Sequence, residues 1–417
     1  MKLWFRRLPL VVTGLAIVWT VTTMVSQTQA PPRGGATPTA PARGATPPTP
    51  AAPAAQARGA APTTYPKAGA YFKNVTTSTL KELSVDDFIA SMGVISAALG
   101  FDCADCHPGA GTDKVDFAID TIADKKTARR MIEMVASINQ TNFAGVQSVT
   151  CWTCHRQQTR PATSIALDHL YEAPNVEDPD IAYPGVGKLT ADQILDKYIQ
   201  AVGGAQRLAG LTSFIATGAS IGYGDFGGDG EFTIYAKAPN LKTTTITFED
   251  HPERGDSIWT VDGTRGWVKT PRGFLPQYEL VGGELTGEKL EAMLAFPGQI
   301  KSALTGWRTG LTRVIDNKDY NIVQGNGPRG PSRDELATLF FDQDTGLLRR
   351  LVRYAPSPVG RVPVQIDYLD YRDVNGIKFP FELRFSWLDG KYSAKLKDIK
   401  TNVAIDASKF GEAALKK

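Results

Sequence analysis

The sequence is poor in cysteine, histidine and excess charge. It contains four cysteines and four histidines in 417 residues, and its formal net charge is only +3. So small a charge on so long a chain does not suggest nucleic acid as a partner. The C-terminal half also lacks a nucleophile motif, a glycine-rich phosphate loop and a metal cluster. The four cysteines are therefore the features that the function must explain.

All four cysteines fall in two copies of one pattern. Residues 103–107 have the sequence CADCH and residues 151–155 have the sequence CWTCH. Cys-x-x-Cys-His is the attachment pattern of c-type haem. Each thiol adds across a haem vinyl group, the two-residue spacer matches the separation of the vinyls, and the adjacent histidine binds the iron. The pattern predicts two covalently attached haems (heme c), with thioethers at Cys103, Cys106, Cys151 and Cys154 and iron ligands at His107 and His155.

A zinc site that uses all four cysteines is the main alternative. It leaves both trailing histidines unexplained. With every cysteine used in a thioether, no disulfide is expected.

A methionine on a predicted helix precedes each motif. The first helix opens at Ser84 and ends at Gly100, with Met92 on its apolar face. The second covers residues 124–139, with Met131 on the apolar stripe and Met134 beside it. A methionine in a helix can simply fill a core. Because helix, methionine, loop and motif occur twice, we predict Met92 and Met131 as the sixth iron ligands, with Met134 as the alternative to Met131.

Together these segments resemble the cytochrome c subunit of photosynthetic reaction centres. The similar stretches are residues 88–92, 103–107, 128–134, 138–139 and 149–156. In that family each haem segment is a helix with an axial methionine, a turn and the attachment motif. The resemblance implies the same pairing here, with Met92 on the first haem and Met131 on the second.

The chain departs from the family pattern in two related ways. The usual subunit has four haems, whereas this chain has motifs for two. The histidine that serves a later haem normally lies between the second methionine and its motif, and residues 140–148 contain none. A half-size relative can serve any periplasmic electron chain, with a reaction centre as one possible acceptor.

The N-terminus is predicted to be a targeting segment. Residues 1–30 begin with positive charge and continue with an apolar stretch, which fits either a cleaved signal peptide or a membrane anchor. Residues 31–66 are a low-complexity Ala/Pro-rich tether without apolar residues to bury. Both interpretations of the first segment place the rest of the chain in the periplasm or otherwise outside the cytoplasm.

Basic residues surround the second motif. Lys125 and Arg129 are expected on the outer side of the second helix, and Arg156 is the best candidate for pairing with haem propionates. Residues 166–187 form a proline-rich linker. His169 in this linker is a weak rival for an axial position.

Residues 188–417 are predicted to form an α+β domain with a curved antiparallel sheet on one or two helices. Thr190 can cap a first helix, a second is expected at residues 286–304, and hairpin turns separate the later strands. We expect strands at residues 232–236, 242–248, 257–261, 266–269, 312–323, 337–341, 347–354, 362–371, 377–387 and 392–399. The pattern weakly resembles periplasmic lipoprotein-carrier folds, which implies a pocket for a hydrophobic ligand. His251 is expected at the surface.

The sequence thus predicts a multidomain protein with a mainly α dihaem c-type cytochrome domain at residues 67–165. Its expected role is electron transfer between redox partner proteins, without a catalytic side chain. One alternative is a dihaem peroxidase-like enzyme, which needs an open iron position. Another is a lipid- or protein-binding module with accessory haems. We also expect few contacts between the two domains, because a proline-rich segment separates them.

Overall fold

The computed structural model describes residues 65–161, 163, 189–223, 230–248, 255–270, 274–310, 312–326 and 336–416. The targeting segment, most of the tether, the 166–187 linker with His169, and His251 lie outside the described residues. Residues 62–417 belong to one compact unit. None of the helices in the described part of the chain combines the length and the apolarity needed to cross a membrane.

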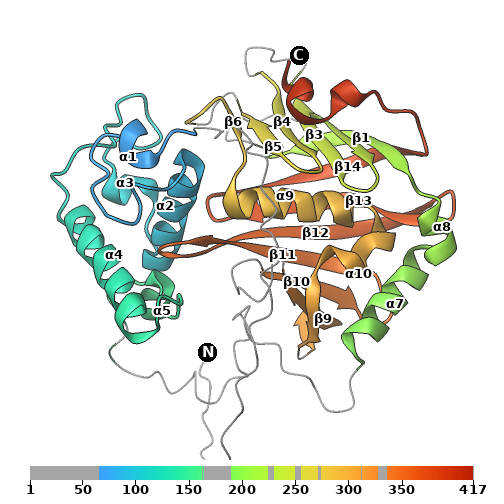
Figure 1. Ribbon diagram of the computed structural model, residues 1–417, viewed down its shortest axis with the longest axis horizontal. Helices are drawn as coiled ribbons and strands as arrows, with labels where there is room; N and C mark the ends of the chain where they lie inside the picture. Colours follow the sequence, from blue (N-terminus) through green and yellow to red (C-terminus); the bar gives the residue numbers. More distant parts are fainter. Residues whose placement is uncertain are drawn as a thin grey trace, which may run out of the picture. The chain divides into compact units, whose positions relative to one another are not determined.

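The described residues of the N-terminal part form the helices α1 (Ala68–Tyr71), α2 (Val85–Leu99), α3 (Cys103–Cys106), α4 (Ala123–Asn142) and α5 (Cys151–His155) (Figure 1). Helix α2 begins and ends where the sequence predicts. The Ser84 hydroxyl accepts a hydrogen bond from the Asp87 backbone N–H, and Gly100 ends the helix in the left-handed conformation. Helix α4 is slightly longer than predicted, and its buried stripe contains Ile132, Val135 and Asn139.

An antiparallel sheet dominates the C-terminal part. Its strands are β1 (Ser213–Ile221), β2 (Gly230–Lys237), β3 (Leu241–Thr247), β4 (Ser257–Asp262), β5 (Gly266–Lys269), β6 (Gln277–Glu279), β7 (Thr305–Thr309), β8 (Arg313–Ile315), β9 (Lys318–Asn326), β10 (Leu336–Asp342), β11 (Leu348–Ser357), β12 (Gly360–Val374), β13 (Ile377–Trp387) and β14 (Gly390–Thr401).

Most strands pair with their neighbours in sequence, as short hairpin connections require. The order is β6-β5-β4-β3-β2-β1-β14-β13-β12-β11-β10-β9-β7, with β8 paired to β9. The pairing of β1 with β14 joins the first and last strands of the domain into one sheet. The predicted antiparallel sheet with helices is therefore confirmed. Strands β1, β6 and β7 were not predicted.

Helices cover one face of this sheet. Helix α7 (Ala191–Val202) begins at Thr190, whose side chain forms the predicted cap with Gln193. Short helix α8 (Ala205–Ala209) follows it. Helix α9 (Gly282–Leu294) packs on β11 and on β3 to β5 (Figure 1). The main core lies between helices and sheet, with Leu195, Phe232 and Phe341 fully buried.

Two predicted elements are divided in the structure. The helix expected at residues 286–304 ends at Leu294, because Pro297 begins a short 3-10 turn before α10 (Ile300–Ala303). The strand expected at residues 312–323 becomes β8 and β9. Asp316 and Asn317 form the turn between them, both with positive φ.

The expectation of few contacts between the two parts is wrong. The tip of the β11–β12 hairpin packs into the N-terminal helices, and Val359 at this tip is fully buried. The cluster around it joins Leu80, Val94 and Ile132 to Ala355, Val359 and Val362. At this hairpin tip, hydrogen bonds also join the two parts, from Gln147 Nε2 to the Ser357 carbonyl at 2.7 Å and from the Cys151 N–H to the Val359 carbonyl at 3.1 Å. The two parts therefore share a core.

Candidate functional site

The first attachment motif is held by its own local hydrogen bonds. Asp102 caps α3, with its carboxylate accepting from the N–H groups of Ala104 and Asp105, and the Asp105 side chain accepts from the Asp102 N–H. This double cap fixes a single helical turn. Cys103 and Cys106 lie at the two ends of that turn, and His107 follows directly.

The structure brings the predicted first site together around one cavity, here called the motif cavity. Its volume is about 560 Å³, and Met92, Cys103, Cys106 and His107 all line it. Helix α2 supplies Met92 from one wall, and α3 supplies the cysteines from another. Apolar side chains make up much of the remaining wall, including Phe72, Leu80, Phe88, Ile95, Leu99, Phe117, Ile132 and Phe274.

The His107 ring is half-buried beside this cavity. Its Nδ1 atom is buried without a hydrogen-bond partner among the described residues. Burial, together with the Lys125 ammonium, lowers the pKa of His107 below its ordinary 6.5. The neutral imidazole is the form that binds a metal.

Helix α4 contributes a polar edge to the same cavity. The expectation that Lys125 and Arg129 lie on the outer side of α4 is wrong, because both line the motif cavity together with Ile132. These positions share one helix face at i, i+4 and i+7. Lys125 donates to the carbonyls of Phe117 and Ile119, at 2.6 and 2.8 Å. Arg129 pairs with Asp120 at 2.7 Å.

The motif cavity also includes a residue of the C-terminal part. Phe274, which precedes β6, lies edge-on to Phe72 and Phe117 at centroid distances of 5.5 and 5.6 Å. The Tyr71 hydroxyl donates to the Phe274 carbonyl at 2.9 Å. Phe117 in turn contacts the His107 ring at 5.2 Å. The sheet domain therefore completes the wall of the first site.

The second motif forms helix α5, which is also capped locally. Thr150 and Thr153 make the reciprocal cap. The His155 Nδ1 atom lies 2.9 Å from the Gln158 carbonyl. A carbonyl can only accept, so Nδ1 carries the proton and Nε2 keeps its lone pair for a metal. Arg156, which ends the helix in the left-handed conformation, is exposed.

Two other contacts fix the position of the second motif. The Asn139 side chain of α4 accepts from the N–H groups of Ser148 and Val149 and donates to the Val149 carbonyl, so it shapes the loop before α5. The Gln157 N–H donates to the Ala98 carbonyl near the end of α2 at 2.9 Å. Helix α5 is thus attached to the helix that bears Met92.

The two candidate methionines of α4 differ in exposure. Met131 is half-buried, whereas Met134 is 43% exposed. The Glu133 carboxylate between them accepts from the Ser78 N–H and hydroxyl at 2.6 and 2.7 Å. This contact fixes the rotation of α4 about its axis.

These residues fit a c-type haem at the first site. The cavity is largely apolar, two cysteine thiols lie on one wall, and a neutral imidazole and a thioether sulfur are available as iron ligands. No group of three or more cysteine, histidine or acidic side chains among the described residues is placed to hold a single metal ion. A four-cysteine zinc site requires such a group.

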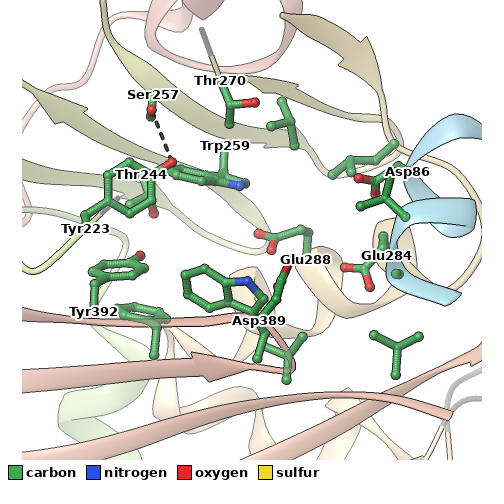
Figure 2. Close-up of a pocket in the computed structure, with 18 of the residues that line it drawn as sticks. Asp86, Tyr223, Thr244, Ser257, Trp259, Thr270, Glu284, Glu288, Asp389 and Tyr392 are labelled. Atoms are coloured by element: carbon green, nitrogen blue, oxygen red, sulfur yellow. Dashed lines mark hydrogen bonds between the residues drawn. The ribbon is translucent and has the colours of Figure 1, made fainter. Parts of the chain in front are cut away.

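A second cavity, here called the sheet cavity, lies between α2, α9 and the sheet (Figure 2). Its volume is about 550 Å³. The carrier resemblance implies a pocket for a hydrophobic ligand, and this cavity has aliphatic and aromatic walls together with charged side chains. Ile89, Gly93, Leu388 and Asp389 line both cavities, so they form a shared wall.

Comparison with known proteins supports the assignment of the N-terminal part. Residues 23–177 match the family model of the photosynthetic reaction centre cytochrome C subunit. The match spans both attachment motifs and both long helices, and it confirms the resemblance seen in the sequence. Over this segment the chain is therefore similar to the cytochrome c subunit family. A search of curated proteins found no match.

Several solved structures are similar to the C-terminal part. A LolA superfamily protein from Nitrosomonas europaea is 15% identical, with a TM-score of 0.36, and the match covers 54% of this chain and 100% of that one. A DUF1329 family protein from Desulfovibrio piger is 14% identical, with a TM-score of 0.37, over 54% of this chain and 99% of that one. An outer membrane lipoprotein-sorting protein domain from Vibrio parahaemolyticus is 10% identical, with a TM-score of 0.38, and the match covers 54% of this chain and 100% of that one.

Sequence reasoning missed three parts of the site. Phe274 and Val359 lie far along the chain from the motifs, so no local pattern connects them. Lys125 and Arg129 were predicted on the outer side of α4 from their polarity alone. Their spacing from the buried Ile132 is the signal that places them on the cavity face.

Proposed function

We propose that the chain is an extracytoplasmic dihaem c-type cytochrome that transfers electrons between redox partner proteins of the periplasm or membrane. One observation carries this proposal: Met92, Cys103, Cys106 and His107 line a single cavity of about 560 Å³. A cavity of this size suits a cofactor. The donor set on its walls is the one that an attached haem requires.

Each residue of the first site has a distinct role in this proposal. Cys103 and Cys106 would form the thioethers, and His107 and Met92 would supply the protein ligands of the iron. The haem iron, when bound, supplies the one-electron ferric/ferrous couple. The Met92 thioether favours the reduced state, and the apolar wall limits solvent access; both raise the potential.

The second site is proposed from its attachment motif and from the local geometry of α5. Cys151 and Cys154 would form the thioethers, and His155, through Nε2, and Met131 would supply the protein ligands of the iron. The half-buried position of Met131 favours it over the more exposed Met134. Arg156 directly follows the motif and is free to pair with a propionate from its exposed position.

The proposed location outside the cytoplasm rests on the targeting segment and on the attachment motifs, because c-type haem is attached there. Whether residues 1–30 act as a membrane anchor is a separate prediction. A reaction centre is one proposed acceptor, supported by the family match. No catalytic side chain is proposed.

Optical spectroscopy of methionine variants tests the ligand set. The oxidised protein should show the weak near-infrared band of methionine-to-iron ligation. Met92→Ala and Met131→Ala should each remove about half of it and open one haem to carbon monoxide. Met134→Ala is the matched control and should leave the band unchanged. If Met134→Ala removes half of the band and Met131→Ala does not, the second ligand is assigned to the wrong methionine.

A further inference from the structure

The sheet cavity is built by elements of both parts of the chain. Asp86 reaches it from α2, three glutamates from α9, and the remaining walls come from the sheet. Figure 2 shows Tyr223, Trp259 and Tyr392 at one side of the cavity and Asp86 and Glu284 at the opposite side. The two sides differ in chemistry.

Aromatic rings form the first side. Tyr223 lies edge-on to Trp259 and to Tyr392, with centroid distances of 5.6 and 5.2 Å, and Tyr392 stacks on Phe385 at 4.6 Å. The Tyr223 hydroxyl donates to the Ser257 hydroxyl at 3.2 Å, which holds its ring in place. Rings arranged in this way offer apolar area and electron-rich faces to a ligand.

Carboxyl groups dominate the other side. Five acidic side chains line the cavity together with two basic ones, Lys242 and Arg353; the acids are Asp86, Glu284, Glu288, Glu291 and Asp389. The described residues around the cavity therefore carry an excess of negative charge. Nothing else charged among its described lining residues offsets that excess.

Both basic side chains are already engaged. The Arg353 guanidinium reaches Glu291 at 2.8 Å, Glu284 at 3.2 Å and Glu288 at 3.3 Å. Lys242 pairs with Glu291 at 2.9 Å. Among the described residues, these two cations are shared by three glutamates.

Asp86 forms no ion pair with a cation among the described residues. Its carboxylate accepts a hydrogen bond from the Tyr278 hydroxyl at 2.9 Å. Burial and the nearby Glu284 carboxylate raise the pKa of Asp86 to about 6. Burial and Glu291 similarly raise the pKa of Glu288 to about 7. Burial close to other carboxylates produces such shifts, and a bound cation would relieve them.

We propose that the sheet cavity binds a small organic cation with an aromatic or apolar body. Its ammonium group lies among Asp86, Glu284 and Glu288, and its body packs against Trp259 and Tyr392. Carboxylates attract the charge, while the rings bury the body and face the cation with their π-systems. A fatty acid or another anion of the same size would be repelled by the same carboxylates. This ligand class goes beyond electron transfer and requires no haem.

Isothermal titration calorimetry on the full-length protein at pH 8 tests the proposal with three probes of one shape. These are 4-phenylbutylamine, 4-phenylbutanol and 4-phenylbutanoate, which differ in the charge of one end. The amine should bind at least about tenfold more tightly than the alcohol, and the carboxylate should bind most weakly. Equal affinities, tighter binding of the carboxylate, or no binding of the amine would overturn the proposal.

Two variants distinguish amine binding in the sheet cavity from a general effect of the net charge of the protein. Asp86→Asn should weaken amine binding at least about tenfold and leave alcohol binding unchanged, because it removes the charge and keeps the shape. Unchanged alcohol binding also shows that the cavity is intact. Asp398→Asn is the matched control, since this exposed carboxylate of β14 removes the same charge outside the cavity. Equal effects of the two variants would refute the assigned site. The result does not depend on the haem count, so failure of this proposal and failure of the proposed electron-transfer function can be told apart.

Discussion

Replacing Val359 with alanine tests whether the sheet and the helices around the attachment motifs fold as one unit. Val359 lies at the tip of the β11–β12 hairpin, is fully buried, and packs with Leu80, Val94 and Ile132. The substitution removes two methyl groups from this shared core. Their transfer to water and the remaining cavity together should lower the free energy of unfolding by about 2 to 3 kcal/mol. The Val359 carbonyl, which accepts from the Cys151 N–H, is retained.

Hydrogen exchange followed by mass spectrometry shows which segments lose stability in the Val359→Ala variant. Under conditions in which exchange reports global unfolding, peptides of α2, of α5 and of strands β2 and β3 should lose protection by the same amount. Val314→Ala is the matched control, because Val314 lies in the same sheet and is 62% exposed. It should change the free energy of unfolding by less than about 0.5 kcal/mol.

The opposite pattern would refute the shared core. If protection falls in the strands while α2 and α5 keep theirs, the hairpin tip does not couple the two parts. The separate domains expected from the proline-rich segment would then be the better description.

Two further changes test the energetics of individual residues. The pKa of Asp86 is about 6 in the folded protein against an ordinary 3.8, so the folded state binds more protons between these pH values and stability falls as the pH rises through them. Asp86→Asn should remove this decline in the free energy of unfolding, which amounts to about 3 kcal/mol. Urea titrations between pH values of about 4 and 7 measure it. An unchanged dependence of the unfolding free energy on pH would contradict the buried position of this carboxyl. Gly100→Ala should lower the free energy of unfolding by more than about 2 kcal/mol. Gly100 has φ +68°, and a Cβ atom there would lie 2.5 Å from the Gln157 carbonyl oxygen. Gly111→Ala is the control, because Gly111 has φ +82° and a Cβ atom there would have nothing within 4 Å. Thermal unfolding of both variants should show a smaller loss of stability for Gly111→Ala. Equal losses would show that the contact with Gln157 is unimportant.

Features with a local cause could be predicted from the sequence. Ser84, Asp87 and Gly100 fix the ends of α2 through neighbours in the chain, and the structure reproduces these ends. The attachment motifs are local in the same sense, because the spacing of the two cysteines and the histidine within five residues is what predicts haem attachment. The hairpins of the sheet follow from their turn residues, such as Asn375 and Gly376, both with positive φ.

Features built from distant residues could not be predicted in this way. The Val359 contact with Cys151 and the contact of Phe274 with Phe117 join segments far apart in the chain. The periodicity of a sequence gives no information on such pairs. Strand β1 was missed for a related reason. Gly218 interrupts its pattern, and the structure shows a register shift there, where a Cβ atom would lie 2.1 Å from the Lys395 carbonyl oxygen.

The acidic character of the sheet cavity also depends on long-range assembly. Asp86 looks like an ordinary helix N-terminal acid in the sequence, where it would be expected to interact with the helix dipole. In the folded chain, burial and the Glu284 carboxylate of the C-terminal part raise its pKa, whereas the hydrogen bond from Tyr278 lowers it.

The haem count is the most direct test of the central claim. Intact-mass spectrometry of protein matured in a host with haem-attachment machinery should give the mass of the processed chain plus two covalent haems. Cys106→Ala and Cys154→Ala should each remove one thioether, at the first and the second site. A mass with one haem, with none, or with zinc instead would contradict the account.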